Sequence, residues 1–367
     1  MDITNREKQI LNAIKHNPQI AQKDLSKKLG ITRSAVAGHI MNLTNKGYIK
    51  GRAYIFGDQS FITVIGGANI DIHGKSLGKI KAKDSNPGKL ITSPGGVARN
   101  IAENISRLGI PCRLVSVIGN DAYGHMLKEH CEGIGIDTQY LMQSDEMSTS
   151  TYMSIIDNSG DMRMAISDMK IVSTLSVAYI KSIKKMIDQS KIIVLDTNIE
   201  DSTLKYIVNT FPKIPIFIDT VSSIKAKKVL PYLANIHTLK PNLMEAEAIS
   251  GIKAKNENEL CMMADWFHKK GLKRLFVTLG QQGIFFSANK KQGIEQLPKL
   301  NQKYKNETGA GDATMAGLVF SWKQQYSLKE TVRNGLIAAH AALTDDKTIT
   351  TTMSIETHKK IYNHQYG

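Results

Sequence analysis

The sequence is poor in cysteine and has no long apolar run. Its 367 residues include three cysteines, Cys112, Cys131 and Cys261, which are widely spaced and form no CxxC pair. Such a sparse, odd set argues against a disulfide framework or a zinc site and favours a reducing compartment. The polar N-terminal residues lack the apolar core of a signal peptide, and no apolar run approaches membrane-spanning length. We therefore expect a cytoplasmic protein without membrane contact.

Acidic residues are outnumbered by basic ones, and unevenly so. The chain has 48 Lys and Arg against 33 Asp and Glu, a formal net charge of +15. Residues 1–57 hold ten of the basic and three of the acidic residues, so this segment contributes +7 and the remainder of the chain +8. The asymmetry predicts a small basic module joined to a larger body. A lysine-rich surface throughout is the alternative explanation.

The basic module has the pattern of a small DNA-binding domain. Apolar spacing predicts helices over residues 6–15, 22–29 and 33–46, with Thr32 as the N-cap of the third. Residues 47–55 are predicted to form a short basic β-hairpin. This order of elements resembles the winged helix-turn-helix heads of bacterial regulators, so we assign residues 1–57 to such a domain.

In that arrangement the third helix enters the major groove of DNA. The residues expected to face nucleic acid are Arg33, Ser34 and His39 toward the bases, and Lys46, Lys50 and Arg52 toward the phosphates. The alternative is a winged-helix domain used for dimerisation or docking.

From residue 60 to residue 367, short apolar strands alternate with amphipathic helices. The predicted strands cover 61–65, 114–118, 191–195, 214–218, 236–239 and 275–279. This alternation is typical of an α/β domain with a doubly wound, mainly parallel sheet. Ligands of such sheets bind at the carboxyl ends of the strands.

A second set of strands interrupts the alternation. Residues 151–156 and 162–166 flank a turn at 157–161, which predicts a hairpin. The polar segment 72–92 is not helical in pattern. We expect the regions of about 72–92 and 150–168 to form a small β-lid that excludes water from the site. Because the edges of such a lid need cover, we also expect a homodimer.

The most informative stretch is TGAGDATMAG at residues 308–317. Gly309, Ala310 and Gly311 predict a turn whose backbone N–H groups form an anion hole, and a helix starting there adds its positive end. Asp312 follows directly and is the candidate general base, with a helix N-cap as the alternative role. An anion hole beside a base is what phosphoryl transfer to an alcohol requires.

Five separated motifs extend this pattern over the body. They are GGANID at 66–71, PGGVARNIA at 94–102, KPNLME at 240–245, TLGQQG at 278–283 and TGAGDA at 308–313. With them, residues 62–345 resemble the ribokinase-like (PfkB) kinases of sugars and nucleosides. Asp84 to Lys89, Asn198 and residues 237–242 are most similar to bacterial pseudouridine kinases.

The resemblance implies an ATP- and Mg²⁺-dependent kinase acting on the 5′-hydroxyl of a nucleoside, with pseudouridine as the expected substrate. Kinases for inosine, cytidine or ribose remain open, as does a ligand-sensing transcription regulator with an inactive kinase body. On the substrate side it implies roles for Asp71, Gly95, Gly96 and Asn100 toward ribose, and for Ser85, Asn86, Lys89 and Asn198 toward the base. A strand-end cap is the alternative for Asp71, and a contact with a neighbouring loop for Asn100.

On the nucleotide side the resemblance implies binding of ATP by Thr278, Gly280, Gly283, Asn242 and Thr308, and of Mg²⁺ by Glu245. Asn242 and Glu245 could instead form a capping box. Members of this family usually carry an aspartate two residues before the signature threonine, where this chain has Asn306. An amide carries no charge, which leaves a K⁺ site open.

Overall fold

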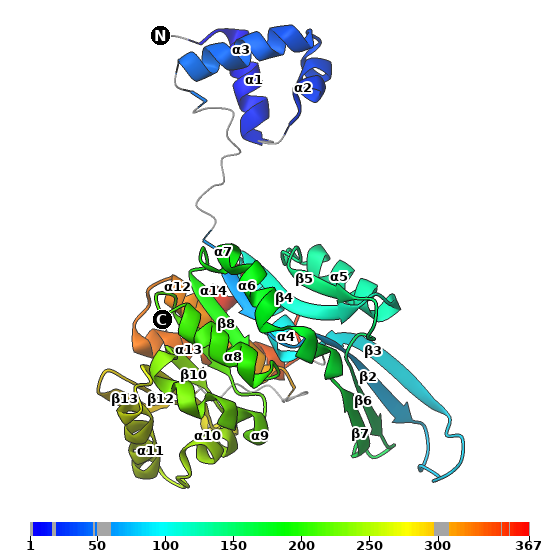
Figure 1. Cartoon of the computed structure of the whole chain (residues 1–367), viewed down its shortest axis with the longest axis vertical. Coiled ribbons are helices and arrows are strands. Elements are labelled where there is room, and N and C mark those ends of the chain that lie inside the picture. The colour runs from blue at the N-terminus through cyan, green and yellow to red at the C-terminus, as the bar shows by residue number, and fades with distance from the viewer. Residues whose placement is uncertain are drawn as a thin grey trace. The chain divides into compact units, whose positions relative to one another are not determined.

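The protein is described by a computed structural model that covers residues 3–16, 20–46, 48–49, 60–296, 308–345, 347–351 and 353–366. The chain divides into two compact units, Met1–Gln59 and Ser60–Gly367. Each unit is described by itself (Figure 1).

The first unit contains the three helices expected from the sequence: α1 (Asn5–His16), α2 (Gln22–Leu29) and α3 (Arg33–Asn45). Gly30 ends α2 with a φ of 62°, and the Thr32 side chain caps α3 by accepting from the Ala35 N–H. The helices pack around buried side chains that include Ile10, Leu25 and Leu43. Most of the hairpin predicted at 47–55 lies outside the described residues.

The second unit contains a nine-stranded sheet within its described residues, in the order β13-β12-β11-β10-β9-β8-β1-β4-β5. Neighbours from β11 through to β5 are parallel, whereas β12 and β13 are antiparallel additions. The mainly parallel sheet is therefore confirmed. The strands are β1 (Ile62–Ile65), β4 (Cys112–Gly119), β5 (Leu141–Ser144), β8 (Ile192–Asp196), β9 (Ile216–Asp219), β10 (Thr238–Lys240), β11 (Arg274–Thr278), β12 (Ile284–Ala288) and β13 (Lys291–Glu295).

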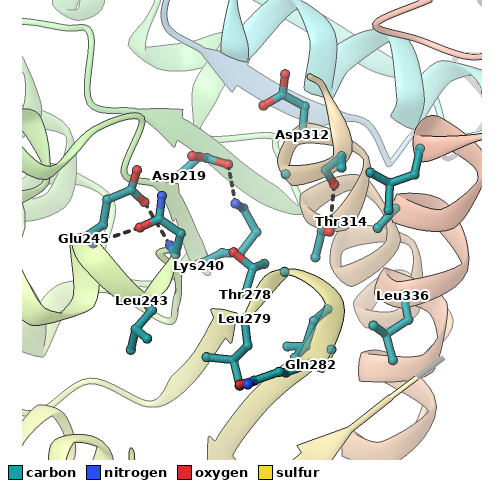
Figure 2. A pocket seen from close by; sticks show the side chains of 18 of the residues that line it. Asp219, Lys240, Leu243, Glu245, Thr278, Leu279, Gln282, Asp312, Thr314 and Leu336 are labelled. Carbon is teal, nitrogen blue, oxygen red and sulfur yellow. Dashed lines mark hydrogen bonds and ion pairs between the residues drawn. The ribbon is translucent and has the colours of Figure 1, made fainter. Parts of the chain in front are cut away.

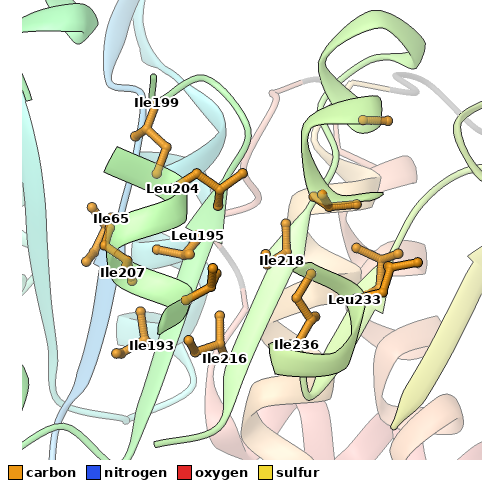
Figure 3. Close-up of a cluster of buried hydrophobic side chains, with 14 of the residues drawn as sticks. Ile65, Ile193, Leu195, Ile199, Leu204, Ile207, Ile216, Ile218, Leu233 and Ile236 are labelled. Atoms are coloured by element: carbon orange, nitrogen blue, oxygen red, sulfur yellow. The ribbon is translucent and has the colours of Figure 1, made fainter. Parts of the chain in front are cut away.

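Helices cover both faces of this sheet because its strands are apolar on both sides. In β8, Ile193 and Leu195 belong to one buried cluster, whereas Ile192 and Val194 belong to the other. Figure 3 shows the first cluster, where Leu204 and Ile207 of a covering helix meet the strands. Each such buried aliphatic side chain contributes roughly 1.5–3 kcal/mol.

One face is covered by α4 (Val97–Arg107), α12 (Ala310–Lys323) and α13 (Leu328–Leu343). The other is covered by α6 (Val177–Ser182), α8 (Asp201–Thr210), η2 (Lys227–Asn235), α10 (Leu243–Ser250) and α11 (Glu257–Lys269). The remaining helices are α5 (Ala122–Gly133), η1 (Lys170–Thr174), α7 (Lys184–Ile187), α9 (Ser223–Ala226), η3 (Gly280–Gln282) and α14 (Ile355–Tyr366). Every helix in the described parts of the chain is too short or too polar to cross a bilayer.

A separate four-stranded sheet extends from the body in the order β3-β2-β6-β7 (Figure 1). Its strands are β2 (Asn69–Ser76), β3 (Gly88–Gly95), β6 (Thr151–Ile156) and β7 (Met162–Asp168). The 157–161 turn joins β6 to β7 as predicted, and β2 runs parallel to β6. The expected β-lid is therefore present, with its first two strands set slightly outside the predicted 72–92 segment.

Candidate active site

A cavity of about 710 Å³ lies where β9, β10 and β11 end and where α10 and α12 begin. Figure 2 shows the side chains that converge on it, with Asp219, Lys240 and Asp312 from three different elements. The position agrees with the rule that ligands of parallel sheets bind at the carboxyl ends of the strands. Of the residues proposed from the sequence, the cavity brings together Asn242, Glu245, Thr278, Gly280, Gly283, Ala310, Gly311 and Asp312.

The N-terminus of α12 has no side-chain cap. Its N-cap residue is Gly309, which has a φ of 84°, and a Cβ atom there would collide with the carbonyl oxygen of Thr348. Only glycine fits this position, and glycine has no side chain with which to satisfy the first N–H groups of the helix. Ala310 and Gly311 therefore present an uncapped, positively polarised helix end to the cavity. Thr308 precedes this turn and does not line the cavity.

Asp312 lies in the first turn of α12 and is 9% exposed. Its carboxylate accepts a hydrogen bond from the Asn100 side-chain amide at 2.8 Å. Burial and the negative charge of Asp219 raise the pKa of Asp312 to about 8, against the opposing effects of Asn100, Lys240 and Arg99. A carboxylate with such a pKa is suited to accept a proton near neutral pH.

Lys240 is a functional candidate that the sequence reasoning missed, and Asp219 was placed at the ligand-binding ends of the strands without a specific role. The Lys240 ammonium is 3.0 Å from Asp219, and a Cβ atom built on Gly311 would lie 3.3 Å from that ammonium. Lys240 is 4% exposed. Burial opposes its charge, but Asp219, Asp312 and Glu245 together raise the pKa of Lys240 above its ordinary value. The anion hole is thus flanked by a buried cation.

Asn242 and Glu245 form a capping box at the start of α10, as the alternative role predicted, and their roles toward ATP and Mg²⁺ stay predictions. The Asn242 side chain accepts from the Glu245 N–H at 2.9 Å, and the Glu245 carboxylate accepts from the Asn242 N–H at 2.9 Å. The Thr220 hydroxyl also donates to Glu245, at 2.6 Å. The carboxylates of Glu245 and Asp219 both line the cavity, and oxygen ligands of this kind fit Mg²⁺.

The opposite wall of the cavity follows β11. Thr278 ends this strand, and Gly280 and Gly283 bracket the short η3 turn with φ values of 60° and 94°. A Cβ atom on Gly283 would collide with the carbonyl oxygen of Glu295. The whole turn lines the cavity, together with the apolar side chains of Leu279 and α13.

At the base of the lid Asp71 lies against Gly95, and Asn100 contacts Asp312. Asp71 accepts from the Asn69 side-chain amide at 2.7 Å, and burial raises the pKa of Asp71. A Cβ atom on Gly95 would collide with the Asp71 carboxylate, so this contact requires glycine. Gly96 follows with a φ of 96° and starts α4, which brings Asn100 to Asp312.

The structure leaves the proposed base-recognition residues apart from the cavity. Asn86 hydrogen-bonds within its own loop, to Lys81 and Asp84, and Ser85 is exposed beside it. Lys89 lies opposite Lys75 across the lid strands, whereas Asp71 lies opposite Ser93. Strand register therefore places these three residues toward the outer part of the lid. Asn198 accepts from Lys225 at 2.6 Å and lies against Gly67.

In the head, Arg33, Ser34 and His39 all lie on α3. Lys46 forms an ion pair of 2.9 Å with Glu7, which ties the end of α3 to α1. Lys50 and Arg52 lie outside the described residues. Asn306, on which the expectation of a K⁺ site depends, also lies outside them.

An uncapped helix end with an adjoining carboxylate, set at the carboxyl edge of a parallel sheet, is the arrangement expected of a phosphotransferase. Residues 59–355 match the family model described as pfkB family carbohydrate kinase. Residues 3–50 match the model described as winged helix-turn-helix DNA-binding. The chain therefore belongs to the pfkB family of carbohydrate kinases and carries an N-terminal winged helix-turn-helix domain.

Curated relatives and solved structures agree with this assignment. The chain is 37% identical over 298 residues to pseudouridine kinase of Escherichia coli, covering 81% of this chain and 95% of that one. It is 35% identical over 338 residues to the uncharacterized sugar kinase YeiI of the same organism, covering 92% and 93%. A carbohydrate kinase structure from Agrobacterium tumefaciens superposes with a TM-score of 0.74 at 25% identity, covering 83% and 98%.

Proposed function

We propose that this kinase transfers the γ-phosphoryl group of ATP to the 5′-hydroxyl of a nucleoside, and that pseudouridine is its substrate. The observation that carries the proposal is the juxtaposition of Asp312, the uncapped start of α12 and Lys240 in one cavity. The similarity to pseudouridine kinase of Escherichia coli supports the choice of substrate.

The residues would divide the reaction as follows. Backbone N–H groups at Ala310 and Gly311 and the Lys240 ammonium bind the terminal phosphate and stabilise the charge on its oxygens. Asp312 accepts the proton of the 5′-hydroxyl as that oxygen bonds to phosphorus and ADP leaves. When bound, Mg²⁺ neutralises phosphate charge, and Glu245 would hold it through water.

Thr278, Gly280 and Gly283, with Asn242 and Thr308 nearby, would bind the remainder of the nucleotide. On the other side of Asp312, the Asp71 carboxylate would accept hydrogen bonds from ribose hydroxyls. A half-buried carboxylate left without its hydroxyl partner is unfavourable, so we expect the corresponding deoxynucleoside to be a poor substrate. Gly95 and Gly96 would admit the ribose close to the backbone.

The test is to incubate the purified full chain with Mg-ATP and a panel of alcohols, following ADP release. Pseudouridine should give the highest kcat/KM among pseudouridine, inosine, cytidine and ribose. A preference for another member of the panel would keep the kinase assignment and overturn the substrate. No turnover with any acceptor, together with ligand binding, would instead favour a regulator with an inactive kinase body.

We also propose that the head binds DNA through α3, with Arg33, Ser34 and His39 toward the bases. The test is binding of the full chain to its own promoter DNA at increasing salt, because phosphate contacts make affinity salt-dependent. The double variant Arg33→Ala/His39→Ala should lose promoter affinity while keeping the kinase rate. Equal affinity of this variant for the promoter would contradict the assignment.

The apolar face of the lid supports a homodimer. Leu90, Met153, Met164 and Ile166 lie on one face by strand register and are 76%, 40%, 61% and 60% exposed. Apolar side chains gathered on one sheet face are typical of an interface. In sedimentation, wild type should be a dimer and the double variant Met164→Glu/Ile166→Glu a monomer. If both proteins sediment as monomers, the proposed dimer is rejected.

The sparse, unpaired cysteines support a cytoplasmic location.

A further inference from the structure

One buried arginine contacts both the end of strand β3 and Asn100, the hydrogen-bond partner of the proposed base Asp312. Arg99 lies on α4 and is 1% exposed. Its guanidinium donates to the carbonyl oxygens of Gly95 at 3.1 Å and Pro94 at 2.9 Å. It also donates to the side-chain oxygen of Asn100 and to Glu103. A guanidinium offers several N–H donors in a fixed plane, and here they converge on the residues around the site.

The contact with Asn100 fixes which way its amide points. The amide oxygen accepts from Arg99, so the amide nitrogen is left to donate to Asp312, at 2.8 Å. The two ends of an amide are nearly equal in shape but opposite in hydrogen-bonding character. In the reversed orientation, the Asn100 oxygen would face the Asp312 carboxylate, and two acceptors would repel each other.

We propose that Arg99 is a positioning residue, which holds Asn100 in the orientation that donates to Asp312 and ties that orientation to Pro94 and Gly95 at the end of β3. The inference rests on the proposed function, because it takes Asp312 as the base. It assigns the role to a residue that does not line the cavity.

The surroundings explain how a cation is kept there. One carboxylate oxygen of Glu103 pairs with Arg99 and His130, and the other pairs with Arg107. Burial opposes ionisation of Glu103, but His130, Arg99 and Arg107 together bring its pKa down to about 2. A buried charge is tolerated when it is paired and hydrogen-bonded. Glu103 therefore neutralises Arg99, and the network is anchored away from the reacting atoms.

Removal of Arg99 would change the base in two ways. Asn100 would sample both amide orientations, and a positive charge near Asp312 would be lost. The other charged groups that face Asp312 are Asp219 from β9 and Lys240 from β10, and both remain. A donated hydrogen bond and a nearby cation favour the ionised carboxylate, so their weakening raises the pKa of Asp312.

The test compares Arg99→Met with Arg107→Met. Arg107 lies on the same helix and pairs with the same Glu103, but it makes no contact with Asn100 among its recorded hydrogen bonds. For Arg99→Met we expect kcat to fall about tenfold to a hundredfold, KM for ATP to stay unchanged, and the acidic limb of the pH–rate profile to move to higher pH. Arg107→Met should keep the wild-type profile.

Arg99→Lys separates charge from orientation. It keeps the cation but cannot span Gly95, Asn100 and Glu103 at once, so kcat should fall while the pH limb stays nearer to that of wild type. The proposal is overturned if the Arg99 and Arg107 variants lose kcat equally, or if Arg99→Met keeps the wild-type pH profile. If Arg99→Met does not fold, Arg99→Lys decides alone, because a kcat equal to that of Arg107→Met rejects the proposal.

A second readout does not depend on turnover. Carboxyl-carbon NMR of aspartate-labelled protein, with the Asp312 signal assigned by Asp312→Asn, gives its titration midpoint without substrate. The midpoint should be higher in Arg99→Met than in wild type and Arg107→Met, and equal midpoints would overturn the positioning role. A failed nucleoside assay with the expected midpoints would reject the proposed function alone.

Discussion

Two helices begin at the same cavity, and they differ in how their N-termini are capped. α10 begins with a complete capping box, in which Asn242 and Glu245 satisfy each other's N–H groups. α12 begins at Gly309, which offers no side chain to its helix. The side chains of α10 cap their own helix, whereas the N-cap residue of α12 provides no side-chain cap. The comparison teaches that a missing cap in a well-built cavity marks a site for ligand binding.

The strongest test of this contrast replaces the carboxylate beside the uncapped end. Asp312→Asn should lower kcat by about 10²–10⁴-fold, the usual contribution of a general base, while nucleotide binding is retained. It is measured as ADP release with matched nucleotide-binding titrations. A variant that keeps the wild-type rate would remove Asp312 from the mechanism.

The same substitution has a stability consequence. The pKa of Asp312 is raised to about 8 in the folded protein, so folding favours its protonated form. Wild-type stability should therefore fall as pH rises from about 4, the ordinary aspartate pKa, to about 8. Asp312→Asn should lack this fall, and its Tm should exceed that of wild type at pH 8. Parallel Tm profiles of wild type and Asp312→Asn would show that folding does not raise the pKa of Asp312.

The next largest effect is expected when Gly311→Ala places a methyl group in the proposed anion hole. Gly311→Ala should stabilise α12 by up to about 1 kcal/mol, because alanine is the better helix former. Its methyl would lie 3.3 Å from the Lys240 ammonium and obstruct the phosphate. We expect kcat/KM for ATP to fall on the order of 10²-fold with an unchanged or higher Tm. Full activity would mean that the phosphate binds elsewhere.

Lys240→Met tests the cation beside the hole. Loss of this charge should weaken nucleotide binding, and it should raise the pKa of Asp312, since Lys240 favours its ionised form. Because the base must be ionised, activity of wild type should rise with pH through about 8, and the variant should need a higher pH. The check is kcat/KM from pH 6 to 10. A limb at the wild-type position would place Lys240 away from the base.

The smallest effects are expected at the capped helix. Asn242→Ala should lower the free energy of unfolding by about 1 kcal/mol, as loss of an N-cap does. Glu245→Gln keeps a side chain that can complete the capping box but removes a charge, so it should raise the Mg²⁺ concentration needed for half-maximal activity with little change in Tm. An unchanged Mg²⁺ dependence would leave Glu245 a purely structural role.

The sequence predicted what depends on local pattern. The parallel sheet follows from apolar strands alternating with helices, and the start of α12 follows from the glycines around Ala310. Lys240 was missed because its partner is set by strand order. Asp219 and Lys240 are opposite each other only because β9 and β10 are neighbours. The contact of Asn100 with Asp312 spans 212 residues, and spacing along the chain does not reveal it.

In the lid, too, the sequence pattern predicts the strands but not how their residues pair. Its strands were predicted from the pattern, whereas the role of Lys89 toward the substrate rests on resemblance alone and stays a prediction. The register pairs Lys89 with Lys75 and leaves Ser93 opposite Asp71. A hydrophobic pattern identifies a strand more readily than it identifies the residue across from it.

The collision between position 309 and Thr348 also limits how this kinase can evolve. Serine, threonine or aspartate at that position would give α12 a stronger start, yet each carries a Cβ atom that Thr348 excludes. A single substitution at position 309 therefore cannot stabilise the N-terminus of α12 at the expense of phosphate binding. Thr348, which follows α13, therefore keeps glycine at position 309 and excludes substitutions that would stabilise the protein but abolish its activity.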